Sequence, residues 1–151
     1  MSTEGLIAYC RPGFEPDLAA ELSHNLGVHG IPAYAKTERN SAYVLLLGAP
    51  RELLSEAIAY DRLIFARQKY ALIDELKDLD VGDRITPVLE ALGGKGRYGD
   101  LSVEHPDSDE ARQLAGLAKA FGNALRPALR KRGMLSDKPN EKLPLLHVVF
   151  I

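Results

Sequence analysis

Cysteine is nearly absent from this chain of 151 residues, which contains Cys10 and no other. A single cysteine excludes a disulfide framework and every zinc site that needs several thiolates. No apolar run approaches the roughly 18 residues of a membrane-spanning helix, and the first residues lack the basic start of a signal peptide. These absences predict a reducing, cytoplasmic location without insertion into a membrane.

Motifs that bind nucleotides or metals are missing as well. There is no Walker A motif, and no predicted strand is followed by the G-x-G-x-x-G pattern. The histidines, at positions 24, 29, 105 and 147, are scattered without ligand spacing, so no metal site is predicted. His147 stands in an apolar stretch and is interpreted as a core residue. The glycine-rich residues 93–97 carry two cations and form either a phosphate-binding loop or a mobile loop.

Cys10 is the one candidate nucleophile, because the neighbouring Arg11 would lower its pKa. Catalysis also requires a general base and an oxyanion hole, and the sequence places neither beside it. Cys10 ends an apolar strand and is therefore interpreted as a buried, inert thiol. No catalytic residue is predicted in this chain.

The first half of the chain alternates between short strands and helices. Strands are predicted at residues 5–10, 29–37, 42–47 and 63–73, and helices begin near Pro16 and Pro50. Gly27 is the predicted end of the first helix, and Pro32 keeps the second strand at a sheet edge. The resulting order, βαββαβ, is that of a split βαβ or ferredoxin-like unit of the α+β class.

A polar connector at residues 76–82 precedes a second, α/β unit. Thr86 is the predicted cap of a short helix that ends at Gly93, and strands are predicted at residues 101–105 and 145–151. Asp107 begins a helix that Gly122 interrupts, and another helix runs over residues 124–132 until Gly133. The predicted domains are therefore residues 1–75 and 76–151.

Charge is unevenly distributed, although the net charge is only −2. Residues 74–110 contain eleven acidic and four basic residues, a balance of −7. Residues 112–142 contain eight basic and two acidic residues, a balance of +6. The basic block either faces an anionic partner or is a solvated helix face whose cations favour its C-terminal end.

Two groups of basic residues are candidates for contact with nucleic acid. In the strand predicted at 63–73, alternation places Phe65 on one face with Arg67 and Lys69, which suits a phosphate backbone or a base. Alternatively, Phe65 is a core residue and the cations lie at the exposed end of the strand. The second group consists of Arg126 and Arg130, which share a helix face, with Lys131 and Arg132; guanidinium groups fit phosphate oxygens.

Several short motifs, in the same order, resemble those of the ribosomal RNA large-subunit methyltransferase M family. They are CRPGFE at 10–15, AYV at 42–44, LIFARQ at 63–68, DRITP at 83–87, the basic helix at 125–133 and the final strand at 147–151. The similarity extends over nearly the whole chain.

This resemblance implies a ferredoxin-like domain followed by a THUMP domain, an RNA-binding module. In the family, a Rossmann-fold domain follows and uses S-adenosylmethionine to methylate a cytidine ribose 2′-hydroxyl in 23S ribosomal RNA. That catalytic domain is expected beyond Ile151, because the chain ends on an apolar strand without a polar tail. The chain alone is therefore expected to bind no cofactor and to methylate nothing.

The expected partner is large-subunit ribosomal RNA, bound by a monomer. The cations that match the family's motifs are Arg11, Arg67, Arg84, Arg126 and Arg130. Lys131 and Arg132 come from the charge pattern alone, and Lys69 comes from the alternation of the strand predicted at 63–73. An alternative stays open, since ferredoxin-like units also serve as dimerisation or small-ligand regulatory modules without specific RNA binding.

Overall fold

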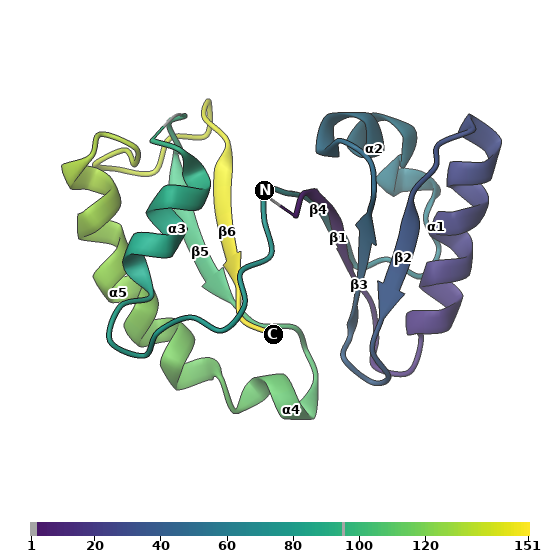
Figure 1. Cartoon of the computed structure of the whole chain (residues 1–151), viewed down its shortest axis with the longest axis horizontal. Helices are drawn as coiled ribbons and strands as arrows, with labels where there is room; N and C mark the ends of the chain where they lie inside the picture. Colours follow the sequence, from purple (N-terminus) through teal and green to yellow (C-terminus); the bar gives the residue numbers. More distant parts are fainter. Residues whose placement is uncertain (1–2, 95) are drawn as a thin grey trace. The chain divides into compact units, whose positions relative to one another are not determined.

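The computed structural model describes residues 3–94 and 96–151 (Figure 1). The chain divides into two compact units, Met1–Glu75 with Pro106–Ser108, and Leu76–His105 with Asp109–Ile151. Each unit combines helices with its own sheet, and the first sheet is antiparallel, which confirms the predicted α+β class. Lys95, a cation of the predicted glycine-rich loop, lies outside the described residues.

The first unit contains a four-stranded antiparallel sheet. Its strands are β1 (Gly5–Tyr9), β2 (Tyr34–Thr37), β3 (Tyr43–Leu47) and β4 (Gln68–Leu72), in the order β2-β3-β1-β4. In the centre, Ile7 of β1 lies opposite Leu45 on one side and Tyr70 on the other. Strand β2 lies at the edge of the sheet, as Pro32 predicted.

The helices α1 (Glu15–His29) and α2 (Arg51–Ala57) cover one face of this sheet, and a 3-10 turn, η1 (Tyr60–Arg62), follows them (Figure 1). Leu18, Leu22 and Leu26 recur every four residues along α1, and all three are buried. They pack with side chains of β1, β3 and α2 and of the residue that follows α2, namely Leu6, Ala8, Val44, Leu46, Leu54 and Ile58. Burial of this apolar stripe holds α1 against the sheet.

The prediction that Gly27 ends the first helix is wrong. Helix α1 continues to His29, and Gly30 adopts the left-handed conformation, with φ of 65°. The Ile31 N–H then bonds to the Leu26 carbonyl oxygen at 3.0 Å, which closes the helix in a Schellman arrangement. Leu26 is buried in the core, so the last turn of the helix still contributes a core side chain.

The strand predicted at residues 63–73 is also shorter than expected, because β4 begins only at Gln68. The preceding segment is held by Glu21 of α1, whose carboxylate accepts the Ile64 N–H at 2.8 Å and the Phe65 N–H at 3.2 Å. Phe65 therefore lies outside the sheet. The alternation that grouped it with Arg67 and Lys69 on one sheet face is wrong.

The second unit contains α3 (Ile85–Leu92), β5 (Asp100–Glu104), α4 (Asp109–Arg112), α5 (Ala115–Lys131) and β6 (Leu145–Val149). Strands β5 and β6 are parallel, with Leu101 opposite Leu146. Helix α5 packs on β5 and α3 through its buried side chains, which include Phe121, Leu125 and Leu129 (Figure 1). Within the described residues, no helix has the length and apolar character required to cross a membrane.

Three features of the helices in this unit differ from the predictions. Gly122 does not interrupt α5 but lies buried within it. A Cβ at this position would lie only 3.3 Å from Val103 Cγ2, which is a tight contact. The absence of a side chain lets the helix lie close to β5. Thr86 lies within α3, and the residue before the helix is Arg84. The first N–H groups of the helix are satisfied by Asp83, whose carboxylate accepts the Ile85 and Thr86 N–H groups, both at 3.0 Å. Helix α5 also begins at Ala115, separated from the short α4.

Candidate nucleic-acid interface

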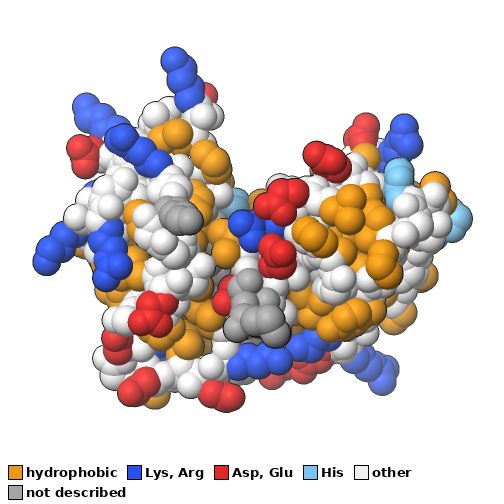
Figure 2. Space-filling model, turned by 45° about the horizontal axis from the view of Figure 1, so that its top comes forward, with side chains coloured by type: hydrophobic (Ala, Val, Ile, Leu, Met, Phe, Trp, Pro, Cys, Tyr) orange, Lys and Arg blue, Asp and Glu red, His pale blue; other side chains and the backbone are white. Residues whose placement is uncertain are grey.

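Helix α5 carries a stripe of polar and basic side chains, hereafter the α5 stripe, which consists of Lys119, Asn123, Arg126 and Arg130. Their spacing of four, three and four residues keeps them within an arc of about 60° on a helix that turns 100° per residue. Lys119, Asn123 and Arg130 are exposed, and Arg126 is half-buried. Figure 2 shows Lys and Arg side chains projecting from the second unit.

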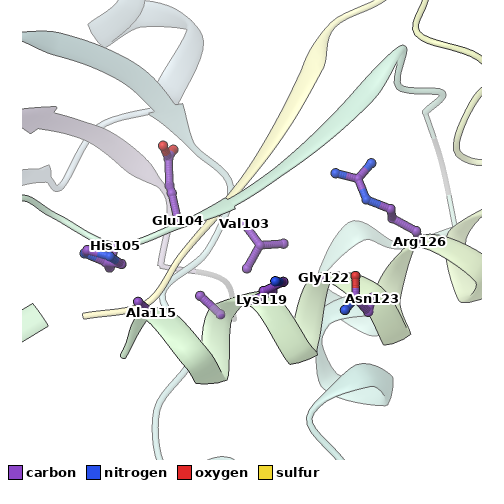
Figure 3. A pocket seen from close by; sticks show the side chains of 9 residues that line it. Val103, Glu104, His105, Ala115, Lys119, Gly122, Asn123 and Arg126 are labelled. Atoms are coloured by element: carbon purple, nitrogen blue, oxygen red, sulfur yellow. The ribbon is translucent and has the colours of Figure 1, made fainter. Parts of the chain in front are cut away.

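A groove of about 430 Å³ lies between α5 and the end of β5, along the part of this stripe that precedes Arg130. Val103 points from β5 toward α5, whereas Glu104 points to the other side of the strand (Figure 3). Lys119, Asn123 and Arg126 line the groove from the helix. The groove therefore combines an apolar wall with two cations, an arrangement suited to a sugar–phosphate chain.

Arg126 connects the helix to the strand. Its guanidinium donates from Nη2 to the Leu101 carbonyl oxygen at 2.8 Å and from Nη1 to Asp100 Oδ1 at 3.2 Å. The pKa of Asp100 is lowered by the Leu101 N–H first, and then by Arg126 and Arg130, which outweigh its partial burial. Arg126 is thus partly neutralised and positions α5 on β5, while Arg130, Lys131 and Arg132 are exposed.

The structure brings the predicted Arg126 and Arg130 together and adds Lys119 and Asn123, which the sequence reasoning missed. The signal that identifies them is the continuation of the four-and-three spacing toward the start of the helix. Lys131 and Arg132 follow Arg130 but lie away from the stripe, around the helix and at its cap. Arg84 is half-buried in the same unit, at the residue before α3.

Lys69 is engaged within the first unit rather than presented to a ligand. Its ammonium donates to the carbonyl oxygens of Ser55, at 2.9 Å, and of Ile58. These carbonyls lie at the C-terminal end of α2, where a cation complements the helix dipole. Burial lowers the pKa of Lys69. This contact gives Lys69 a structural role.

The motif at 10–15 forms a turn that presents an arginine and a ring. The Phe14 N–H donates to the Arg11 carbonyl oxygen at 3.1 Å, and the ring of Phe14 stacks on Phe65 with centroids 6.0 Å apart. The Arg67 N–H bonds to the Tyr9 carbonyl oxygen at 2.7 Å, which ties the segment after Phe65 to the end of β1. Arg11 and Arg67 are both exposed.

Glu15 is the buried centre of this turn, with 1% of its surface exposed. Its carboxylate accepts N–H groups from Gly13 at 3.0 Å, from Asn40 at 2.9 Å and from Ala42 at 3.1 Å. One side chain therefore joins the start of α1 to the turn before β3, and it fixes the conformation that places Arg11 and Phe14 on the surface.

Cys10 lies beneath the same turn, and its thiol donates to Glu15 Oε2 at 3.8 Å. Burial, followed by the negative charge of Glu15, raises the pKa of Cys10 to about 12. If Cys10 is an inert thiol, iodoacetamide at pH 8 should leave it unmodified in the native chain over the time in which it fully alkylates Cys10 in the denatured chain. Equal rates, measured by mass spectrometry, would contradict this.

Within residues 3–94 and 96–151, no group of three or more His, Cys, Asp or Glu side chains is arranged to hold a metal ion. The half-buried His147 places Nδ1 2.8 Å from Glu104 Oε1, across the β5–β6 pair. This contact supports the interpretation of His147 as a satisfied interior residue.

The strand order β2-β3-β1-β4, with two helices on one face, defines the first unit as a ferredoxin-like α+β domain. The family model described as RlmM ferredoxin-like domain matches residues 3–70, and that described as "Ribosomal RNA large subunit methyltransferase M, N-terminal" matches residues 83–151. The chain belongs to the ribosomal RNA large subunit methyltransferase M family and corresponds to its N-terminal region.

Three similar proteins are each described as ribosomal RNA large subunit methyltransferase M. Those from Xanthomonas axonopodis pv. citri, Xanthomonas campestris pv. campestris strain B100 and Xanthomonas oryzae pv. oryzae strain KACC10331 are 58%, 57% and 56% identical to the chain over 147 residues. Each match covers 97% of this chain and 42% of the relative, so the chain spans less than half the length of these proteins.

Proposed function

We propose that this chain is the RNA-binding part of an S-adenosylmethionine-dependent enzyme that methylates a cytidine ribose 2′-hydroxyl in large-subunit ribosomal RNA. The second unit, as a THUMP-like domain, binds the RNA and positions it for a catalytic domain that also binds the cofactor. The observation that carries this proposal is the α5 stripe beside its groove. The name of the relatives supports ribosomal RNA as the class of partner.

The dimensions of the stripe suit this role. Lys119 and Arg130 are separated by eleven residues, or about 16 Å along the helix axis. This length follows several nucleotides of an RNA backbone, and phosphate contacts of this kind fix the register and orientation of a nucleic acid without reading its sequence. The proposed role of the chain is accordingly to orient the RNA, and recognition of the target nucleotide belongs to the catalytic domain.

Salt titration of RNA binding tests the proposal. Three or four phosphate contacts to a single strand give a slope of log K against log salt of about −2 to −3. We expect this slope, measured by fluorescence anisotropy, for fragments of large-subunit ribosomal RNA. A slope near zero would contradict the proposal.

Sedimentation at two protein concentrations examines the proposed monomer. A sedimentation coefficient that does not change with concentration is expected. A concentration-dependent dimer without affinity for RNA would instead favour a regulatory ferredoxin-like module.

A further inference from the structure

We propose that Phe14 and Phe65 form a stacking platform for one unpaired base of the RNA, with Arg11 and Arg67 beside it for the adjoining phosphates. This inference rests on the proposed function, since it takes RNA as the ligand, but it concerns the first unit and a different kind of contact. The two rings stack at 6.0 Å with an angle of 25° between their planes, and 41% of Phe14 is exposed.

Both rings are held in place before any ligand binds. Phe14 stands between Gly13, whose N–H is fixed by Glu15, and Glu15 itself, which is buried. Phe65 donates its N–H to Glu21, and its side chain packs against the core of the first unit. An ordered ring surface binds a base at a low entropic cost, because neither ring has to be immobilised on binding.

The neighbouring charges select an anionic aromatic ligand over an apolar one. Arg11 and Phe14 lie at the two ends of one turn. The Phe14 N–H donates to the Arg11 carbonyl oxygen and closes this turn. Arg67 is two residues beyond Phe65 and pairs with Asp107 at 3.2 Å, with side-chain exposures of 48% and 59%. An ion pair this exposed contributes little to stability, so a phosphate exchanges readily for Asp107. A base with its phosphate combines the π-face and the negative charge that this surface requires.

The probe is a seven-nucleotide RNA, six uridines around a central 2-aminopurine, whose fluorescence falls when its base stacks. We expect the wild-type chain to quench this fluorescence, and Phe14→Ala to weaken binding about 10-fold and to abolish quenching. Phe14→Leu keeps apolar bulk without the π-face and is expected to lose the quenching as well. Val28→Ala, at an exposed position of α1 in the same unit, is the matched control and retains it.

Photo-crosslinking supplies a measurement that needs no variant. A 5-iodouridine in place of the 2-aminopurine is expected to crosslink to the peptide that contains Phe14 or Phe65, identified by mass spectrometry. Unchanged quenching in both Phe14 variants, or crosslinks confined to the second unit, would overturn the platform while leaving the proposed function intact. If ribosomal RNA binding is lost in the Phe14 variants but the 2-aminopurine stays fluorescent with the wild-type chain, stacking would be overturned. If the chain bound no RNA at all, the proposed function itself would be rejected.

Discussion

Replacing Glu15 with Ala is expected to lower the free energy of unfolding of the first unit by about 3 kcal/mol, a large fraction of the stability of a small domain. The buried carboxylate accepts N–H groups from Gly13, Asn40 and Ala42, and its removal leaves all three donors without their partner. The Ala42 donor is buried, and a buried donor that loses its acceptor costs about 1–3 kcal/mol. Gly13 and Asn40 are exposed residues, so water replaces part of what their donors lose.

Asp17→Asn is the matched control, because Asp17 lies in the same first turn of α1 but is exposed. It loses only its interaction with the helix dipole, at most about 1 kcal/mol. Hydrogen exchange in β1 and β3 measures the local stability, and exchange in α5 is the internal reference. Equal protection of β1 and β3 in the Glu15 and Asp17 variants would contradict the prediction.

The pH dependence of this stability follows from the direction of the pKa shift. Burial alone raises the pKa of Glu15, but the N–H groups of Asn40, Ala42 and Gly13 outweigh it, so the folded-state pKa is lowered. A lowered carboxyl pKa contributes stability that is present above the unfolded pKa, about 4.5, and is lost as pH falls through the folded value. The difference in free energy of unfolding between wild type and Glu15→Gln is thus constant at neutral pH and becomes smaller below about pH 4. A constant difference down to pH 2 would contradict this.

Glu15 also shows which features of the fold the sequence could predict. The strands around Ile7 and Leu45, the edge strand after Pro32 and the apolar stripe of α1 follow from local patterns, and the structure contains all of them. The family motif at 10–15 marked this turn as specific, but its role depends on Asn40 and Ala42, which are distant in sequence. Local periodicity carries no information about a carboxylate that bonds to a separate turn.

The errors have the same origin in contacts between distant residues. Residues 63–67 have the composition of a strand, yet Glu21 takes the Ile64 and Phe65 N–H groups that a sheet would have used. Gly122 resembles a helix breaker, but its close approach to Val103 requires a residue without a side chain inside α5. In both cases tertiary packing outweighed the local preference of the residue.

For the candidate interface, the sequence identified the basic helix but not the distinct roles of its cations. Arg126 appeared equivalent to Arg130, whereas the structure engages Arg126 with Asp100 and Leu101 and leaves Arg130 exposed. Lys119 lies outside the dense basic cluster, and its alignment with Arg130 becomes visible only once α5 is one continuous helix. A net charge per segment therefore locates a candidate surface without identifying the side chains that contact a ligand.

This geometry leads to a prediction that charge alone does not make. The double variant Lys119→Ala with Arg130→Ala removes two exposed cations of the α5 stripe and is expected to weaken binding of ribosomal RNA fragments about 30-fold at 0.1 M salt. The magnitude of the salt slope should fall by about 1.5, because two phosphate contacts are lost. Arg126 is left intact, since its removal would deprive Asp100 and Leu101 of their partner.

Two further double variants remove the same charge elsewhere in the second unit. Lys138→Ala with Lys142→Ala changes exposed residues outside the groove and should leave the slope nearly unchanged. Lys131→Ala with Arg132→Ala changes the cluster that follows the stripe, and an intermediate effect is expected because these cations flank Arg130. Anisotropy titrations at several salt concentrations compare all three. Equal losses of RNA affinity in all three variants would show that binding depends on net charge alone. A larger loss of affinity for the Lys131 and Arg132 variant would place the interface at the C-terminal end of α5 rather than at the groove.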